Sequence, residues 1–145
     1  MGKRKDIINA IAGVLDRLQL PNGDLITVYK TFVDPLLGLN NIPYVSVVPE
    51  PENVRIGLWG DTEDNSLRIA IFGYCGKKYG ESLFDVSEDM VETIKKAIAD
   101  QTNADIFHGV GFSCIDMGPI LNEQMDIDGN LAYISVPINT VYIDD

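Results

Sequence analysis

The sequence predicts an α+β domain: a mixed, mainly antiparallel sheet of four to six strands with two helices packed on one face. Two segments space their apolar residues as amphipathic helices do. At least four others are short and rich in β-branched and aromatic residues, as strands are. Their order is helix, three or four strands, helix, two strands. Two helices serving this many strands cover one sheet face, and 145 residues correspond to a single domain, 1–145.

The first helix is predicted from Lys5 to Leu18, where apolar residues recur every three to four positions. Pro21–Asp24 ends it with a turn. The basic start of the chain does not resemble a signal peptide, because Asp16 and Arg17 interrupt the apolar spacing. No apolar run reaches the roughly 18 to 20 residues of a membrane span, so we expect no membrane insertion.

The next strands are predicted from β-branched and aromatic content. They are Leu25–Phe32, the proline-bounded Ile42–Pro49, and Leu67–Cys75, and the segment 53–60 could add a short fourth. In Leu67–Cys75 both faces are apolar beyond the first residue, so we expect both to be covered.

A second helix is predicted from Asp85 to Thr102, with Asp85 and Glu88 in the spacing of a capping box. Two strands follow, Ala104–Asp116 and Leu131–Ile143. Pro137 lies inside the latter and cannot donate to a ladder, which suggests an edge strand or a bulge.

Phe72 and Tyr74 place large apolar groups on the sheet face that two helices would leave open. Either a loop of the chain folds back over them or another protein chain covers them, because a contiguous apolar patch marks an interface. The sequence leaves both alternatives open.

The chain carries 22 Asp and Glu against 11 Lys and Arg, a net charge of −11. This charge opposes binding to a nucleic-acid backbone, which needs clustered cations. It serves either solubility or repulsion of something anionic. Cys75 and Cys114 lie in apolar runs and are expected to be buried free thiols in a reducing compartment.

Two motifs, one acidic and one rich in glycine, partly match the patterns of known ligand-binding loops. Asp126, Asp128 and Asn130 alternate as in a calcium loop, but Leu131 and Pro137 stand where an EF-hand needs Gly and Glu. A hairpin turn is predicted there instead. The segment 73–81 lacks the spacing of a phosphate loop, and is predicted to be a flexible loop whose Lys77 and Lys78 meet acidic residues of a partner.

Two single residues remain. His108, the one histidine, is predicted on a strand face as a satisfied core residue. With no second His for zinc and no nucleophile signature beside it, we expect neither a catalytic site, nor a metal, nor a cofactor. Trp59 is either packed on the core or an interface anchor.

The whole chain resembles the tail terminator (tail completion) proteins of long-tailed bacteriophages. The resemblance is carried by the order of its pieces: the helix "IINAIAGVLDRL", the strand "IPYVSVVPEPE" followed by an acidic hairpin-like region, the strand "LRIAIFGYC" leading into "SEDMVETIKKAIA", and a late acidic hairpin before "AYISVPINTVYI". It covers nearly the whole chain.

The resemblance implies a homohexameric ring that caps the tail tube, stops its polymerisation and offers the head-joining surface. Its partners would be the tail tube protein and a head-side connector, in the virion and, before that, in the host cytoplasm. DNA would pass through the hole without specific binding. Under this hypothesis Asp61, Glu63 and Asp64 face the lumen or tube. Trp59, Phe72, Tyr74, Lys77, Lys78 and Tyr79 lie at or near subunit interfaces.

Two alternatives belong to other classes. The first is a different phage neck or head–tail connector protein, with the same ring but other neighbours. The second is a small cellular enzyme or ligand-binding domain, which would need a concave pocket with convergent polar groups.

Overall fold

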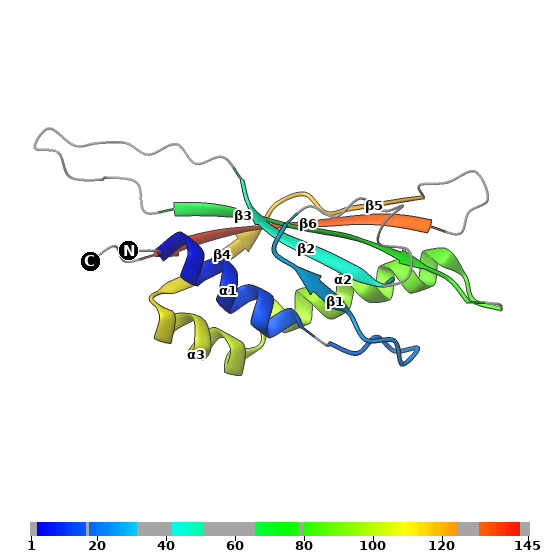
Figure 1. The fold of residues 1–145 in the computed structure, drawn as a ribbon, viewed down its shortest axis with the longest axis horizontal. Coiled ribbons are helices and arrows are strands. Elements are labelled where there is room, and N and C mark those ends of the chain that lie inside the picture. The colour runs from blue at the N-terminus through cyan, green and yellow to red at the C-terminus, as the bar shows by residue number, and fades with distance from the viewer. Residues whose placement is uncertain are drawn as a thin grey trace, which may run out of the picture.

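The computed structural model describes residues 3–16, 18–31, 42–50, 66–78, 80–124 and 131–142. These residues form three helices and a six-stranded sheet, and all three helices lie on one face of the sheet (Figure 1). The predicted fold class is confirmed. The number of helices differs from the prediction by one.

The sheet runs in the order β1-β2-β3-β6-β4, and β5 also pairs with β6. Only β1 and β2 are parallel; the other pairs are antiparallel. The strands are β1 (Thr27–Tyr29), β2 (Tyr44–Pro49), β3 (Ser66–Gly76), β4 (Phe112–Met117), β5 (Leu121–Gln124) and β6 (Leu131–Tyr142).

β6 is a central strand, so the edge position suggested by Pro137 is wrong. It pairs with β3 on one side and with β4 and β5 on the other. The carbonyl of Pro137 accepts the N–H of Gly118, between β4 and β5. In an antiparallel sheet the N–H and C=O of one residue point to the same side of the strand. The side on which Pro137 lacks an N–H is therefore the side of the gap between β4 and β5, and the hydrogen bonds between β6 and β3 are not affected.

The first two helices follow their apolar stripes. α1 (Lys3–Leu15) packs on the sheet, and α2 (Leu83–Ala99) begins two residues before the predicted start. The cap is Ser82, whose hydroxyl accepts the N–H of Asp85 at 3.4 Å. Asp85 is therefore the third residue of the helix and not its cap, which corrects the predicted Asp85–Glu88 capping box.

The predicted strand Ala104–Asp116 is wrong in its first half, where the chain forms α3 (Gln101–Val110). Asp100 caps α3 by accepting the N–H groups of Thr102 and Asn103. Gly111, with φ of 104°, ends the helix, and β4 starts at the next residue. Ile106, His108 and Val110 alternate as in a strand, but the helix buries Phe107 instead, against Phe112 at 4.9 Å between ring centroids.

Two other segments differ from expectation. β1 is shorter than the predicted Leu25–Phe32, and Leu25 instead bridges to Gln19. The predicted hairpin before β6 is present as β5 paired with β6, although β5 itself was not predicted. Its turn, residues 125–130, and the segment 53–60 lie outside the described residues.

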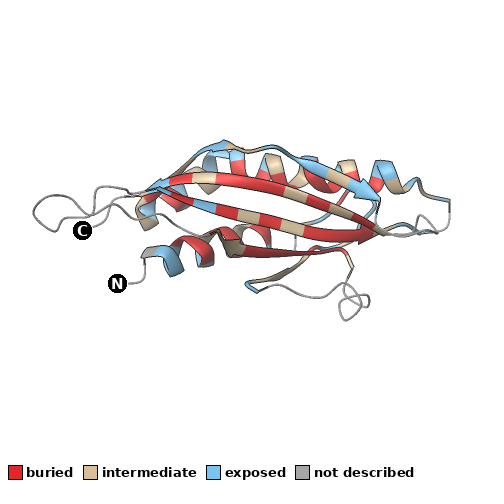
Figure 2. Ribbon diagram, turned by 90° about the horizontal axis from the view of Figure 1, so that it is seen from above, coloured by how far each residue is buried: buried red, intermediate tan, exposed pale blue. Residues whose placement is uncertain are grey.

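The core lies between the helices and the sheet. Alternate residues of β2, β3 and β6 belong to it, and buried residues of α1 and α2 close it. Along β3 and β6, buried residues alternate for the most part with less buried ones (Figure 2). The strand residues of the core include Val45, Val47, Leu67, Ile69, Ile71, Cys75, Ala132, Ile134, Val136 and Ile138.

We predict that Gly73→Ala destabilises the fold. A Cβ at Gly73 would lie 2.1 Å from the carbonyl oxygen of Tyr44 and 2.9 Å from Cα of Val45, and both atoms are backbone. Overpacking of this kind costs about 1–3 kcal/mol, which a urea unfolding curve followed by circular dichroism would measure.

Gly13→Ala is the matched control, because Gly13 is exposed in α1 with no atom within 4 Å of its added Cβ. Alanine should stabilise that helix by up to about 1 kcal/mol. Equal stability of the two variants would contradict the predicted collision.

Candidate interaction surface

The sheet face opposite the helices, called here the helix-free face, is the candidate site. The strand registers and the alternation of side chains assign its residues. They are Tyr44, Ser46 and Val48 of β2, Arg68, Ala70, Phe72 and Tyr74 of β3, Leu121 and Glu123 of β5, and Tyr133, Ser135, Pro137, Asn139 and Val141 of β6.

An aromatic row crosses this face. Neighbouring ring centroids are 5.6 Å apart for Tyr29 and Tyr44, 5.5 Å for Tyr44 and Tyr74, and 5.4 Å for Tyr74 and Tyr133. Phe72 joins the row at 6.3 Å from Tyr133. Such cross-strand aromatic pairs stabilise a sheet by roughly 0.2–1 kcal/mol each, so the row is part of what holds the strands together.

The row is buried at one end and partly open at the other. Tyr44 is 0% exposed and Tyr74 is 5% exposed, whereas Phe72 and Tyr133 are half-buried. Tyr74 is therefore buried within the single chain, and little of the Tyr74 side chain remains exposed to contact a second molecule. Phe72 retains exposed surface that a partner can contact.

Apolar exposure continues from Phe72 toward the β5 edge of the sheet. Ser135 of β6 pairs with Phe72 on one side and with Leu121 on the other, so the three residues lie in line across three strands. Leu121 is 45% exposed, and Ile120 beside it is also exposed. The sequence did not indicate Leu121, because β5 is a short and otherwise polar strand.

The other predicted interface residues are placed differently or lie outside the described residues. Lys77 is exposed just after β3. Trp59, Tyr79 and the acids Asp61, Glu63 and Asp64 belong to the residues that the structure does not describe.

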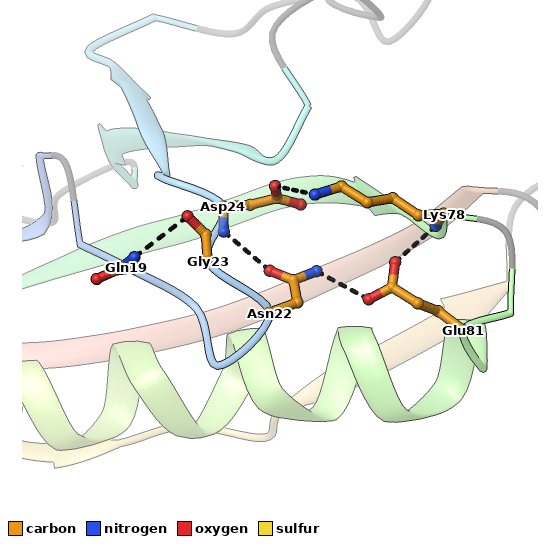
Figure 3. Close-up of polar contacts among 6 residues, drawn as sticks. All are labelled: Gln19, Asn22, Gly23, Asp24, Lys78 and Glu81. Carbon is orange, nitrogen blue, oxygen red and sulfur yellow. Dashed lines mark hydrogen bonds and ion pairs between the residues drawn. The ribbon is translucent and has the colours of Figure 1, made fainter.

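Lys78 finds an acidic partner within its own chain. Its Nζ lies 2.7 Å from Oδ1 of Asp24, and its N–H donates to Oε1 of Glu81 at 2.6 Å (Figure 3). Asn22 bridges the same two segments by donating to Oε2 of Glu81 at 3.1 Å and accepting the N–H of Asp24. The hydrogen bond to Asp24 and its negative charge raise the pKa of Lys78. Lys78 and Glu81 are thus tied to the turn at 22–24.

His108 is exposed on α3, so its prediction as a core residue is wrong. It borders a cavity of about 270 Å³ together with Phe112, Ser113, Val141 and Tyr142. The described part of the chain contains no group of three His, Cys, Asp or Glu side chains placed to hold a metal ion.

The two cysteines are free thiols, as predicted. Cys75 is buried and Cys114 half-buried, and burial raises their pKa to about 12 and about 11. Both thiols therefore stay protonated near neutral pH, which makes them poor nucleophiles. None of the described helices is long and apolar enough to cross a membrane.

No protein-family model matches this chain, and no curated protein matches its sequence.

We predict that Asp24→Asn lowers the pKa of Lys78. The pKa is raised in the folded protein, so the ion pair contributes stability below the unfolded value near 10.5, and this contribution disappears as the pH rises through the folded value. The chemical shift of the Lys78 ε-carbon, followed between pH 8 and 12, would show a lower midpoint in the variant.

Asp16→Asn is the matched control, since it removes the same charge at an exposed position after α1. It should leave the Lys78 midpoint unchanged. An equal decrease in both variants would mean that net charge, and not the Asp24 contact, sets the pKa.

Proposed function

We propose that this chain is a bacteriophage tail terminator, a structural protein and not an enzyme. Six copies form a ring that caps the tail tube, stops its polymerisation and presents the head-joining surface. The partners are further copies of the chain, the tail tube protein and a head-side connector. DNA passes through the ring.

The half-buried end of the aromatic row and the exposed Leu121 beside it on the helix-free face are the observation that carries the proposal. Phe72 and Leu121 lie on either side of Ser135 there, with Tyr133 next to Phe72. Leu121 is 45% exposed, and apolar surface gathered in one place is typical of a protein–protein contact. In a closed ring every copy meets a neighbour through the same heterologous contact, so this surface can be covered in all copies at once.

Net charge supports the proposal independently. A ring of chains that each carry a net charge of −11 repels DNA phosphates overall, because binding along the nucleic-acid backbone requires an excess of cations. Passage without binding is what a channel for DNA requires, and Asp61, Glu63 and Asp64 are our candidates for residues facing it.

Native mass measured over a concentration series, with and without purified tail tube, tests the proposal. We expect a hexamer, either in solution or on tube ends, and tubes that no longer elongate. A monomer at every concentration that leaves tube growth unchanged would refute it.

We predict that Leu121→Ser weakens ring assembly. Full burial of a leucine contributes about 1.5–3 kcal/mol, and Leu121 is 45% exposed, so a contact that covers it adds about half of that. Because each 1.4 kcal/mol is a tenfold change in affinity, the concentration at half assembly should rise about three- to tenfold in the native mass series.

Leu25→Ser is the control, because Leu25 is an exposed leucine beside the turn at 22–24 and lies outside the six strands of the sheet. It should assemble like the parent chain. Equal effects of the two variants would argue against a specific role for the β5 edge.

We also predict that neutralising Asp61, Glu63 and Asp64 together leaves the fold and the hexamer intact. Only head joining or DNA passage should change, because these acids are proposed to face the lumen or the tube. Phage yield and DNA retention in reconstituted particles measure head joining and DNA passage, and circular dichroism of the variant measures whether the fold is intact. Loss of the fold would refute this placement.

A further inference from the structure

The most exposed large apolar side chain among the described residues is Phe84, at 67%. It is the second residue of α2, immediately after the capped start of the helix. Asp85 beside it and Asp89 one turn later are exposed, so the phenyl ring projects from an acidic surface. Exposure of a phenylalanine to this extent has no role in the fold of the single chain.

A shallow apolar hollow lies between α1 and α3. Ala10, Ile106 and Val110 form its apolar wall, Asp6 and Asn9 complete it, and its volume is about 490 Å³. Ile106 is 48% exposed. Both helices pack their buried sides inward, so the hollow faces away from the core.

Phe84 and the hollow lie at opposite ends of the helix layer. In Figure 1 the start of α2 is at one end of the molecule, while the start of α1 and the end of α3 are at the other. The two features cannot meet within one copy. They can meet only between copies. When each copy offers Phe84 to one neighbour and the hollow to another, the contact is heterologous and builds rings or filaments, whereas a reciprocal contact between two copies would stop at a dimer.

Charge favours this pairing over contact between two like ends. The first turn of α1 carries the exposed basic residues Arg4 and Lys5, and two acids, Asp6 and Asp105, lie nearby on α1 and α3. Cations at a helix N-terminus are opposed by the helix dipole, so an acidic surface brought against them relieves that repulsion. The start of α2 supplies Glu81, Asp85 and Asp89.

We propose that Phe84 of one copy enters the α1–α3 hollow of the next copy, with the acidic start of α2 against the basic start of α1. The occupant of the hollow is thus a second copy of this chain, and the helix layers join head to tail. This inference rests on the proposed ring and names a contact that closes it.

Two variants of the full chain, each missing one half of the contact, test the proposal. The Phe84→Ser variant retains an intact hollow, and the Ile106→Asp variant retains Phe84. Native mass spectrometry should show each variant alone as a monomer. Their equimolar mixture should give a dimer and nothing larger, because only Phe84 of the Ile106→Asp chain and the hollow of the Phe84→Ser chain can still form the contact. Where the parent chain assembles only on purified tail tube, the readout is the number of copies on each tube end.

Charge reversal gives a second readout. Asp85→Lys should raise the concentration at half assembly at least tenfold, and adding Lys5→Glu to the same chain should restore it. Circular dichroism verifies the fold of each variant.

The outcomes separate this inference from the proposed function. A hexamer that persists in Phe84→Ser and Ile106→Asp would overturn the head-to-tail contact and leave the ring standing. Open chains of many lengths that both variants abolish would support the contact and contradict the closed ring. A parent chain that is monomeric with and without tail tube would overturn both.

Discussion

The pairing of β3 with β6 is the constraint on which the rest of the structure depends. All eleven residues of β3 pair with β6, from Ser66 with Val141 to Gly76 with Leu131. A shift of one residue would turn Leu67, Ile69 and Ile71 away from the helices. The buried hydroxyl of Thr140 donates to the carbonyl of Leu67 at 2.8 Å and adds a contact that fits only this register.

The two sides of these strands carry different chemistry, and this difference separates fold from function. Toward the helices the side chains are aliphatic and form the core. On the helix-free face they are aromatic in the middle, with the ion pair of Arg68 and Glu50 at 3.0 Å farther along. Stability of the single chain comes chiefly from the first side, so changes at the edge of the second side can alter assembly while leaving the fold in place.

The elements with strong periodicity could be predicted from the sequence. α1, β2, β3 and β6 lie within two or three residues of their predicted bounds, because each has a clear apolar stripe or a β-branched run. α3 could not be predicted, since Ile106, His108 and Val110 alternate like a strand and its decisive features are the cap at Asp100 and the left-handed Gly111.

The candidate site was predictable in part. The position of Phe72 and Tyr74 on the second face follows from alternation alone, but their different burial depends on the fold of the whole chain. Lys78 and Asp24 are 54 residues apart, so no local pattern could pair them. Leu121 joins the surface only because β5, a strand with little apolar signal, lies beside β6.

The position of β6 in the chain has a consequence for synthesis. β6 follows every other described element, yet it is the strand that β3, β4 and β5 all need. While a ribosome translates the preceding residues, β3 has β2 on one side and an unpaired edge on the other. An unpaired edge of this length invites aggregation. Until β6 has been synthesised, the aliphatic and aromatic side chains of β3 therefore lie beside a strand edge that only the last described element can close.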